Sequence, residues 1–131
     1  NFLIPGTLKE NIITKDSRKI EEIKIYQLLE EFGLSTFSLN SIINDGKDLV
    51  SGGQKQRINI VRCLLEKRPL LFMDEPSSAL DEKNVKNLVS LIDTYSNERL
   101  VAIISHDPDS FLSLKKLRIF DLNISNKLKK I

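Results

Sequence analysis

Two short apolar runs constrain the fold of this chain more than any other feature of its sequence. Residues 70 to 73 read LLFM and residues 100 to 104 read LVAII. Runs of this length and composition are typical of strands that are buried on both faces of a sheet. A helical pattern separates them, so we expect the strands to pair in parallel and helices to cover the sheet. The predicted fold class is therefore α/β.

The first half of the chain shows the spacing of short helices. Thr7 is a good N-cap and Glu10 lies three residues later, as in a capping box, so a short helix or turn should begin there. Apolar residues at helical spacing predict an amphipathic helix within residues 17–32, which Gly33 would terminate. Residues 34–49 are rich in Ser, Asn, Asp and Gly and should form a loop.

Two further helices and one more strand are expected in the second half. One helix should run from Gly52 to Lys67, because Pro69 ends the apolar pattern. Another should begin at Asp81. Residues 117–122, LRIFDL, are expected to add a third strand, in which the apolar residues alternate.

The composition narrows the class of protein. A chain of 131 residues can form one domain with a core, or part of one, and no apolar run approaches the roughly 20 residues of a membrane span. Lys and Arg number 20 against 18 Asp and Glu, and the two signs are mixed, so we expect no nucleic-acid partner. A single cysteine, Cys63, leaves no internal disulfide and suits a reducing, cytosolic setting.

Polar clusters follow both predicted strands. Asp74 and Glu75 come directly after the first, and Ser105, His106 and Asp107 come after the second. Ligands bind beyond the carboxyl ends of parallel strands, and desolvated carboxylates must be paired, protonated or bound to a cation. One acid can therefore hold a hard cation such as Mg²⁺ while the other polarises water. The alternatives are a polar turn that starts a helix and a histidine that is only a surface hydrogen-bonding group.

The stretch VSGGQKQR at residues 50–57 raises a separate question, because adjacent glycines are an unfavourable way to begin a helix. The first turn of a helix has unpaired N–H groups and the positive end of the helix dipole. Glycines at that point let an anion approach the backbone closely. The sequence Ser51-Gly52-Gly53 therefore favours a phosphate-binding site, and the alternative is a flexible hinge before the helix.

Together these segments resemble the nucleotide-binding domain of ATP-binding-cassette (ABC) ATPases, which have a P-loop NTPase fold. VSGGQKQR (50–57) is similar to the signature motif of that family, and LLFMDEP (70–76) is similar to Walker B with its catalytic glutamate. SALD (78–81) resembles the D-loop and SHD (105–107) the H-loop. PGTLKENI (5–12) is similar to the segment that follows the Q-loop in many exporters.

The resemblance implies ATP and Mg²⁺ as ligands and assigns roles at the strand ends. Asp74 would help to hold Mg²⁺ through its water ligands. Glu75 would act as the base, or orient the water, for attack on the γ-phosphate. His106 would contact that phosphate and the attacking water.

The resemblance also implies partners. In this family two nucleotide-binding domains pair head to tail and enclose two ATP molecules. Ser51, Gly52, Gly53 and Gln54 would contact the nucleotide bound by the second domain, and Asp81 would lie at the interface between the two domains. Transmembrane domains of a transporter would be the other partner, which would place the chain at the cytoplasmic side of the cell membrane.

Three parts of the family pattern do not occur in these residues, namely the P-loop, the Q-loop glutamine and the aromatic residue that stacks on adenine. No GxxxxGK[ST] motif, the P-loop that cradles the phosphates, is found in the sequence. We therefore expect residues 1–66 to form the helical signature subdomain and residues 67–131 to form the C-terminal half of the RecA-like ATPase core, with the P-loop half upstream. This chain by itself is then expected not to hydrolyse ATP.

Three functions follow from these observations. The leading one is ATP hydrolysis that powers transport across a membrane. The others are a non-transport ABC ATPase that acts on ribosomes or DNA and a regulatory cassette that binds nucleotide without hydrolysing it. The sequence specifies neither the transported substrate nor the direction of transport.

Overall fold

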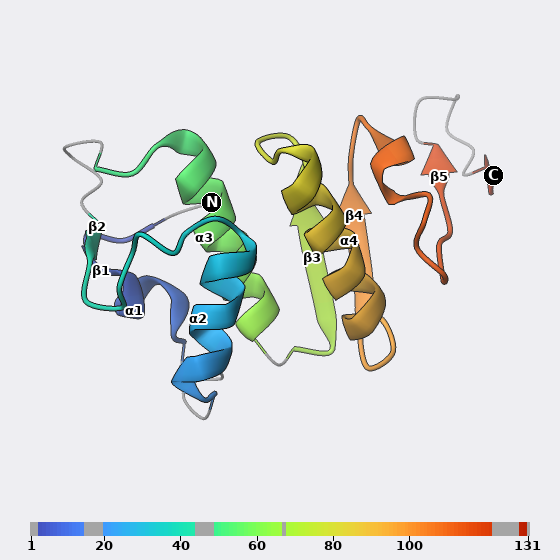
Figure 1. Cartoon of the computed structure of the whole chain (residues 1–131). Helices are drawn as coiled ribbons and strands as arrows, with labels where there is room; N and C mark the ends of the chain where they lie inside the picture. Colours follow the sequence, from blue (N-terminus) through green and yellow to red (C-terminus); the bar gives the residue numbers. More distant parts are fainter. Residues whose placement is uncertain (1–2, 15–19, 44–48, 67, 122–128, 131) are drawn as a thin grey trace.

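The computed structural model describes residues 3–14, 20–43, 49–66, 68–121 and 129–130. Helices α1, α2 and α3 gather on one side of the molecule, and β3, α4 and β4 lie together on the other (Figure 1). The elements in chain order are β1 (Gly6–Thr7), α1 (Leu8–Ile12), α2 (Glu22–Glu31), β2 (Ile42–Ile43), α3 (Gly52–Leu65), β3 (Leu70–Asp74), α4 (Glu82–Tyr95), β4 (Leu100–Ile104), the 3-10 helix η2 (Pro108–Phe111), β5 (Phe120–Asp121) and β6 (Lys129–Lys130).

The two apolar runs form the parallel pair that the sequence predicts. β3 and β4 pair in register from Leu70 opposite Leu100 to Asp74 opposite Ile104, with α4 as the connection between them. Both strands therefore end at the same edge of the sheet. The α/β fold class is confirmed.

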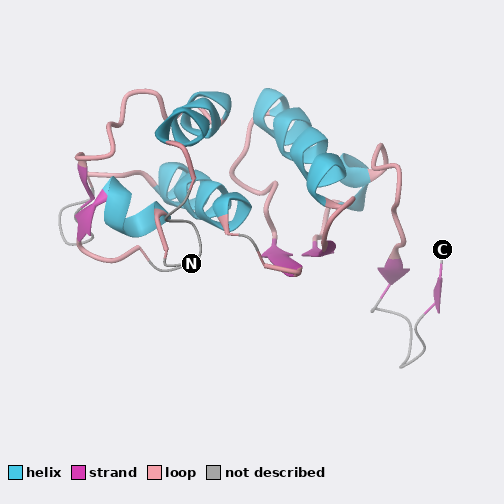
Figure 2. Cartoon of the chain, turned by 90° about the horizontal axis from the view of Figure 1, so that it is seen from below, coloured by secondary structure: helices cyan, strands magenta, loops and turns pink. Residues whose placement is uncertain are grey.

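The prediction that both strands are buried on both faces is wrong. Leu71 and Met73 are buried, whereas 51% of Leu70, 57% of Phe72 and 69% of Leu100 is exposed. Figure 2 shows the helices on one side of the sheet. Because no described element covers the opposite side, every second residue of β3 faces outward.

The predicted third strand does not join this sheet. Of residues 117–122, only Phe120–Asp121 form a strand, and it pairs antiparallel with β6; residue 122 lies outside the described residues. A parallel crossover needs a dozen or more residues, usually with an α-helix. After β4 the described chain offers only the four-residue helix η2 for that purpose.

The helix boundaries follow local capping chemistry. The Thr7 capping box of α1 is confirmed, as is the termination of α2 at Gly33, which has a left-handed φ of +64°. α2 begins only at Glu22, and residues 17–19 of its predicted first turns lie outside the described residues. α3 ends at Leu65, two residues early, and Asp81 is the N-cap of α4.

A single apolar core joins the two sides of the molecule. Side chains from the helices and from one face of the sheet belong to the same buried cluster. Its members include Leu8, Ile25, Phe32, Ile58 and Leu64 from the helical side, and Leu71, Met73, Leu88, Ile92 and Phe111 from the strand side.

The C-terminal end of α2 is tied to two other helices. The carbonyl oxygen of Phe32 accepts a hydrogen bond of 3.2 Å from Nη1 of Arg57, which lies in α3. The carbonyl oxygen of Glu31 accepts one of 2.8 Å from Nδ2 of Asn87, which lies in α4. The last carbonyl groups of a helix have no partner within it, so these side chains complete α2 while joining it to both neighbours.

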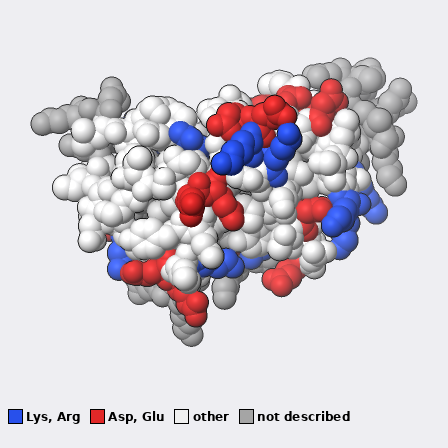
Figure 3. All heavy atoms as spheres, in the orientation of Figure 1, with Lys and Arg blue, Asp and Glu red and all other residues white. Residues whose placement is uncertain are grey.

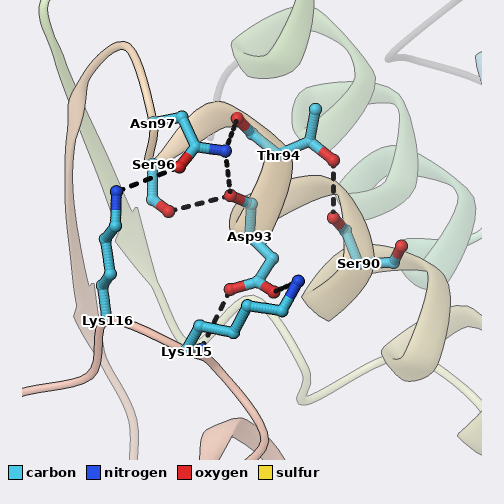
Figure 4. A network of polar contacts seen from close by, with 7 residues as sticks. All are labelled: Ser90, Asp93, Thr94, Ser96, Asn97, Lys115 and Lys116. Carbon is cyan, nitrogen blue, oxygen red and sulfur yellow. Dashed lines mark hydrogen bonds and ion pairs between the residues drawn. The ribbon is translucent and has the colours of Figure 1, made fainter.

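Polar contacts attach the segment after η2 to the C-terminal end of α4 (Figure 4). The carboxylate of Asp93 accepts a hydrogen bond of 3.0 Å from the backbone N–H of Lys115 and lies 3.4 Å from Nζ of that lysine. Nζ of Lys116 donates to Oδ1 of Asn97 over 3.0 Å. The chain that follows β4 is therefore held on α4 by lysines beside the negative end of the helix dipole.

Charges of both signs lie close to one another on the face drawn in Figure 3. Among the described residues, no helix is both long enough and apolar enough to cross a membrane.

Candidate functional site

Glu75 follows the last residue of β3 in a strained conformation. Its φ is +46°, in the left-handed region that a non-glycine residue enters at a cost of about 1–3 kcal/mol. Pro76 follows it, and a proline restricts the preceding residue toward extended conformations. The backbone N–H of Glu75 donates to the carbonyl oxygen of Ile104 over 2.9 Å, which anchors the turn to the end of β4.

The structure brings Glu75 and His106 together. Oε1 of Glu75 accepts a hydrogen bond of 2.6 Å from the backbone N–H of His106, and Nε2 of the imidazole lies 3.9 Å from the same oxygen. The Glu75 side chain is 31% exposed and the His106 side chain 95% exposed. The carboxylate is therefore fixed at the shared edge of the sheet by backbone, while the imidazole faces solvent beside it.

Asp74 ends β3 directly before Glu75. It lies opposite Ile104 in the strand register and is exposed, and its carboxylate makes no hydrogen bond or ion pair with the described residues. No group of three metal-ligating side chains occurs among the described residues. Mg²⁺ is commonly held by one or two carboxylates together with waters and substrate phosphates, so a single free carboxylate at this edge fits that manner of binding.

The start of α3 is closed by a capping box. Oγ of Ser51 accepts a hydrogen bond of 3.2 Å from the backbone N–H of Gln54, and Oε1 of Gln54 accepts one of 2.8 Å from the N–H of Ser51. Ser51 lies on the surface and Gln54 is half-buried. The Gln54 side chain, predicted to contact nucleotide, is thus engaged with Ser51 in this structure.

The space around the two glycines of the first turn would accept a larger residue. A Cβ atom at Gly52 would meet nothing within 4 Å, and one at Gly53 would lie in ordinary contact, 3.6 Å from the carbonyl oxygen of Ala79. Neither glycine has the left-handed φ that favours glycine. Glycine in a helix is less favourable than alanine by roughly 0.5–1 kcal/mol, so these residues leave a bare backbone surface at a cost in stability.

Asp81 has a clear role within the chain. Its Oδ1 accepts a hydrogen bond of 2.8 Å from the backbone N–H of Asn84, which caps α4. An N-cap aspartate stabilises a helix by about 1 kcal/mol. This contact accounts for Asp81 without an interface, so its predicted place between two domains stays a prediction.

Gln56 lies beside Glu75, although the sequence gives it no separate role. Its Nε2 donates to the carbonyl oxygen of Glu75 over 2.8 Å and to Oγ of Ser78 over 3.1 Å. These contacts join α3 to the turn that follows β3. The only signal in the sequence is that Gln56 lies within VSGGQKQR, because no local rule relates residues 19 positions apart.

Cys63 lies on α3 and is half-buried. It borders a small cavity of about 60 Å³ whose lining extends to Asp74 and Pro76 at the end of β3. Burial raises the pKa of the Cys63 thiol above its ordinary value, while the nearby Arg62 charge acts in the opposite direction. A thiol that keeps its proton is a poor nucleophile, so the structure gives Cys63 a packing role.

Comparison with known proteins identifies the family. The family model described as ABC transporter matches residues 1–78, so the chain belongs to the ABC transporter family. The lipoprotein-releasing system ATP-binding protein LolD of Leptospira interrogans (serogroup Icterohaemorrhagiae, serovar Lai) is 34% identical over 122 residues, which are 91% of this chain and 51% of that protein. The ABC-type transmembrane transporter verA of Clonostachys rogersoniana is 37% identical over 106 residues, which are 77% of this chain and 8% of that protein.

A solved structure shares the fold. A chain in the crystal structure of the complex of an archaeal ribosomal stalk protein and an archaeal ribosome recycling factor aligns with a TM-score of 0.69 and 24% identity, over 92% of this chain and 23% of that one. This chain spans only 8% and 51% of the two curated relatives named above. The comparisons therefore establish the family and the P-loop NTPase fold.

Proposed function

We propose that this chain is part of an ATP-hydrolysing domain that powers transport of a substrate across a membrane. The observation that carries the proposal is the Glu75 carboxylate, held beside His106 at the shared carboxyl edge of β3 and β4. Membership of the ABC transporter family and the similarity to the ATP-binding protein LolD support the same function.

In the proposed mechanism each residue at the sheet edge has a separate task. Glu75 accepts a proton from the attacking water, or orients that water, from a position fixed by the His106 N–H. The exposed imidazole of His106 would contact the γ-phosphate, and the Asp74 carboxylate would help to hold Mg²⁺. ATP and Mg²⁺, when bound, supply the reacting phosphate and the cation that neutralises its charge.

The start of α3 is proposed to serve a second domain. Ser51, Gly52, Gly53 and Gln54 lie at the positive end of a 14-residue helix whose first turn carries no acidic residue. The N–H groups of Ser51 and Gln54 are bonded within the capping box, so Gly52 and Gly53 would offer theirs to a phosphate. Because no described residue requires a glycine at position 52, we propose that a nucleotide bound by a second domain approaches there. Asp81 would lie at the same interface, in a head-to-tail pair.

The wider arrangement is part of the proposal. Residues 1–66 would form the helical signature subdomain, and residues 67–131 would form half of the ATPase core. Transmembrane domains would be the coupled partner, as the name of the verA relative suggests, with this chain on the cytoplasmic side of the membrane.

ATP turnover by the whole protein that contains this chain tests the proposal. We expect Mg-ATP hydrolysis whose rate rises faster than linearly with protein concentration, and loss of turnover in Glu75→Gln with ATP binding retained. Glu75→Gln keeps the size of the side chain and removes only its basicity. If wild type and variant both bind ATP and neither turns it over, the catalytic roles are wrong and a regulatory function is the better account.

A further inference from the structure

The backbone of Glu75 needs support from its surroundings. Its left-handed φ of +46° is unfavourable for a residue with a side chain, and such conformations persist only when neighbouring groups enforce them. The carbonyl oxygen of Glu75 accepts hydrogen bonds from Ser78 N at 3.2 Å, from Ser78 Oγ at 2.9 Å and from Gln56 Nε2 at 2.8 Å. This oxygen holds the turn together with the N–H of Glu75, which donates to the carbonyl oxygen of Ile104.

The three donors to this oxygen differ in origin. Both donors of Ser78 belong to the turn itself, so their hydrogen bonds are local to it. Gln56 comes from α3 and connects the turn to a separate rigid element. A side-chain amide has two hydrogens, so Gln56 can donate to Glu75 O and to Ser78 Oγ at the same time and bind both ends of the turn.

We propose that Gln56 is a positioning residue for the Glu75 carboxylate, which rests on the proposed role of Glu75 in hydrolysis. Gln56 holds the Glu75 backbone in its left-handed conformation, and that conformation directs the carboxylate to the N–H of His106, 2.6 Å away. Rotation about φ would move Cβ and the carboxylate from this place. A displacement of 1 Å in an active site can lower a rate by about a hundredfold.

The position of Gln56 on α3 separates this role from folding. The aliphatic side chains of α3 are all buried in the core, whereas Gln56 is only half-buried. Removal of its amide therefore leaves the apolar contacts of the helix intact. A loss of activity can then be measured on a folded protein.

The test replaces Gln56 by methionine in the whole protein. Gln56→Met keeps the length of the side chain and removes its donors, and Gln56→Asn keeps the amide but is one methylene too short. We expect kcat for ATP to fall about ten- to hundredfold in both variants, with KM within about twofold of wild type. A purely structural role would instead lower the unfolding temperature and the amount of active protein without this split between kcat and KM.

Gln27→Met is the matched control, because Gln27 lies on the exposed surface of α2 and should leave kcat unchanged. Wild-type kcat in Gln56→Met would overturn the inference. If Gln56→Met does not fold, Gln56→Asn decides by the same criterion. If the proposed function itself is wrong, the result differs, because the wild-type protein would then show no ATP turnover that depends on Glu75.

Discussion

Helix α3 and strand β3 follow one another in the chain and differ in how completely they are covered. Every aliphatic residue of α3 is buried, with 5% exposure at most, at Ile60. In β3, Leu70 and Phe72 are more than half exposed while Leu71 and Met73 are buried. The described residues therefore bury the aliphatic side chains of α3 but only one face of the sheet. An uncovered apolar face of this kind usually marks a surface that contacts further protein.

The same two elements differ in a second respect. α3 begins with Gly52, whose backbone does not need a glycine, and β3 leads into Glu75, whose left-handed backbone would suit one. Both choices lower the stability of the chain. Residues that reduce stability without a local benefit are typical of functional sites.

The largest expected difference concerns a matched pair of leucines. Leu64 in α3 is 2% exposed and Leu70 in β3 is 51% exposed. We expect Leu64→Ala to lower the free energy of unfolding by about 2–5 kcal/mol, because it leaves a cavity, and Leu70→Ala to lower it by less than about 1 kcal/mol. Urea denaturation of the chain measures both. Equal losses would mean that the outer face of the sheet is covered in solution.

A smaller effect is expected at the strained turn. Glu75→Gly removes a side chain from a left-handed position and should raise the free energy of unfolding by about 1 kcal/mol. Glu98→Gly is a suitable control on an exposed turn where no left-handed φ is present. A decrease in stability for Glu75→Gly would show that the hydrogen bond to His106 outweighs the backbone strain.

A substitution in the first turn of α3 should also raise the free energy of unfolding. Gly52→Ala places a methyl group in open space and should raise the free energy of unfolding by roughly 0.5–1 kcal/mol. In the whole protein the same change should reduce ATP turnover, since the methyl group would stand where nucleotide is proposed to approach. Unchanged turnover in Gly52→Ala would mean that position 52 does not need a glycine for ligand binding.

The smallest expected effect is the pH dependence due to Cys63 in α3. Burial raises the pKa of its thiol in the folded chain above the value in the unfolded chain. The unfolded state therefore loses this proton first, and the stability contributed by Cys63 declines as pH rises from the ordinary thiol value toward the folded one. Urea denaturation across this range should show a decline that is weaker in Cys63→Ala. An identical decline in both would assign the effect to other groups.

Much of the fold could be predicted because its signals are local. The capping box at Thr7, the glycine end of α2 and the parallel pairing of the two apolar runs depend on neighbouring residues or on the alternation of elements. The third strand could not be predicted, because an apolar run at 117–122 does not reveal which strand it will pair with. The site residues Glu75 and His106 were predicted together, since parallel strands end at one edge.

The sequence by itself determined the family, the order of helices α1 to α4 and of strands β3 and β4, and the cluster at the strand ends, because motifs and apolar spacing are properties of neighbouring residues. Only the tertiary structure decided which face of the sheet is covered, that no described residue requires a glycine at position 52, and that Gln56 donates to the carbonyl oxygen of Glu75. These facts depend on contacts between residues far apart in the chain. Such contacts are set by how α3 packs beside β3, and no local pattern encodes that arrangement.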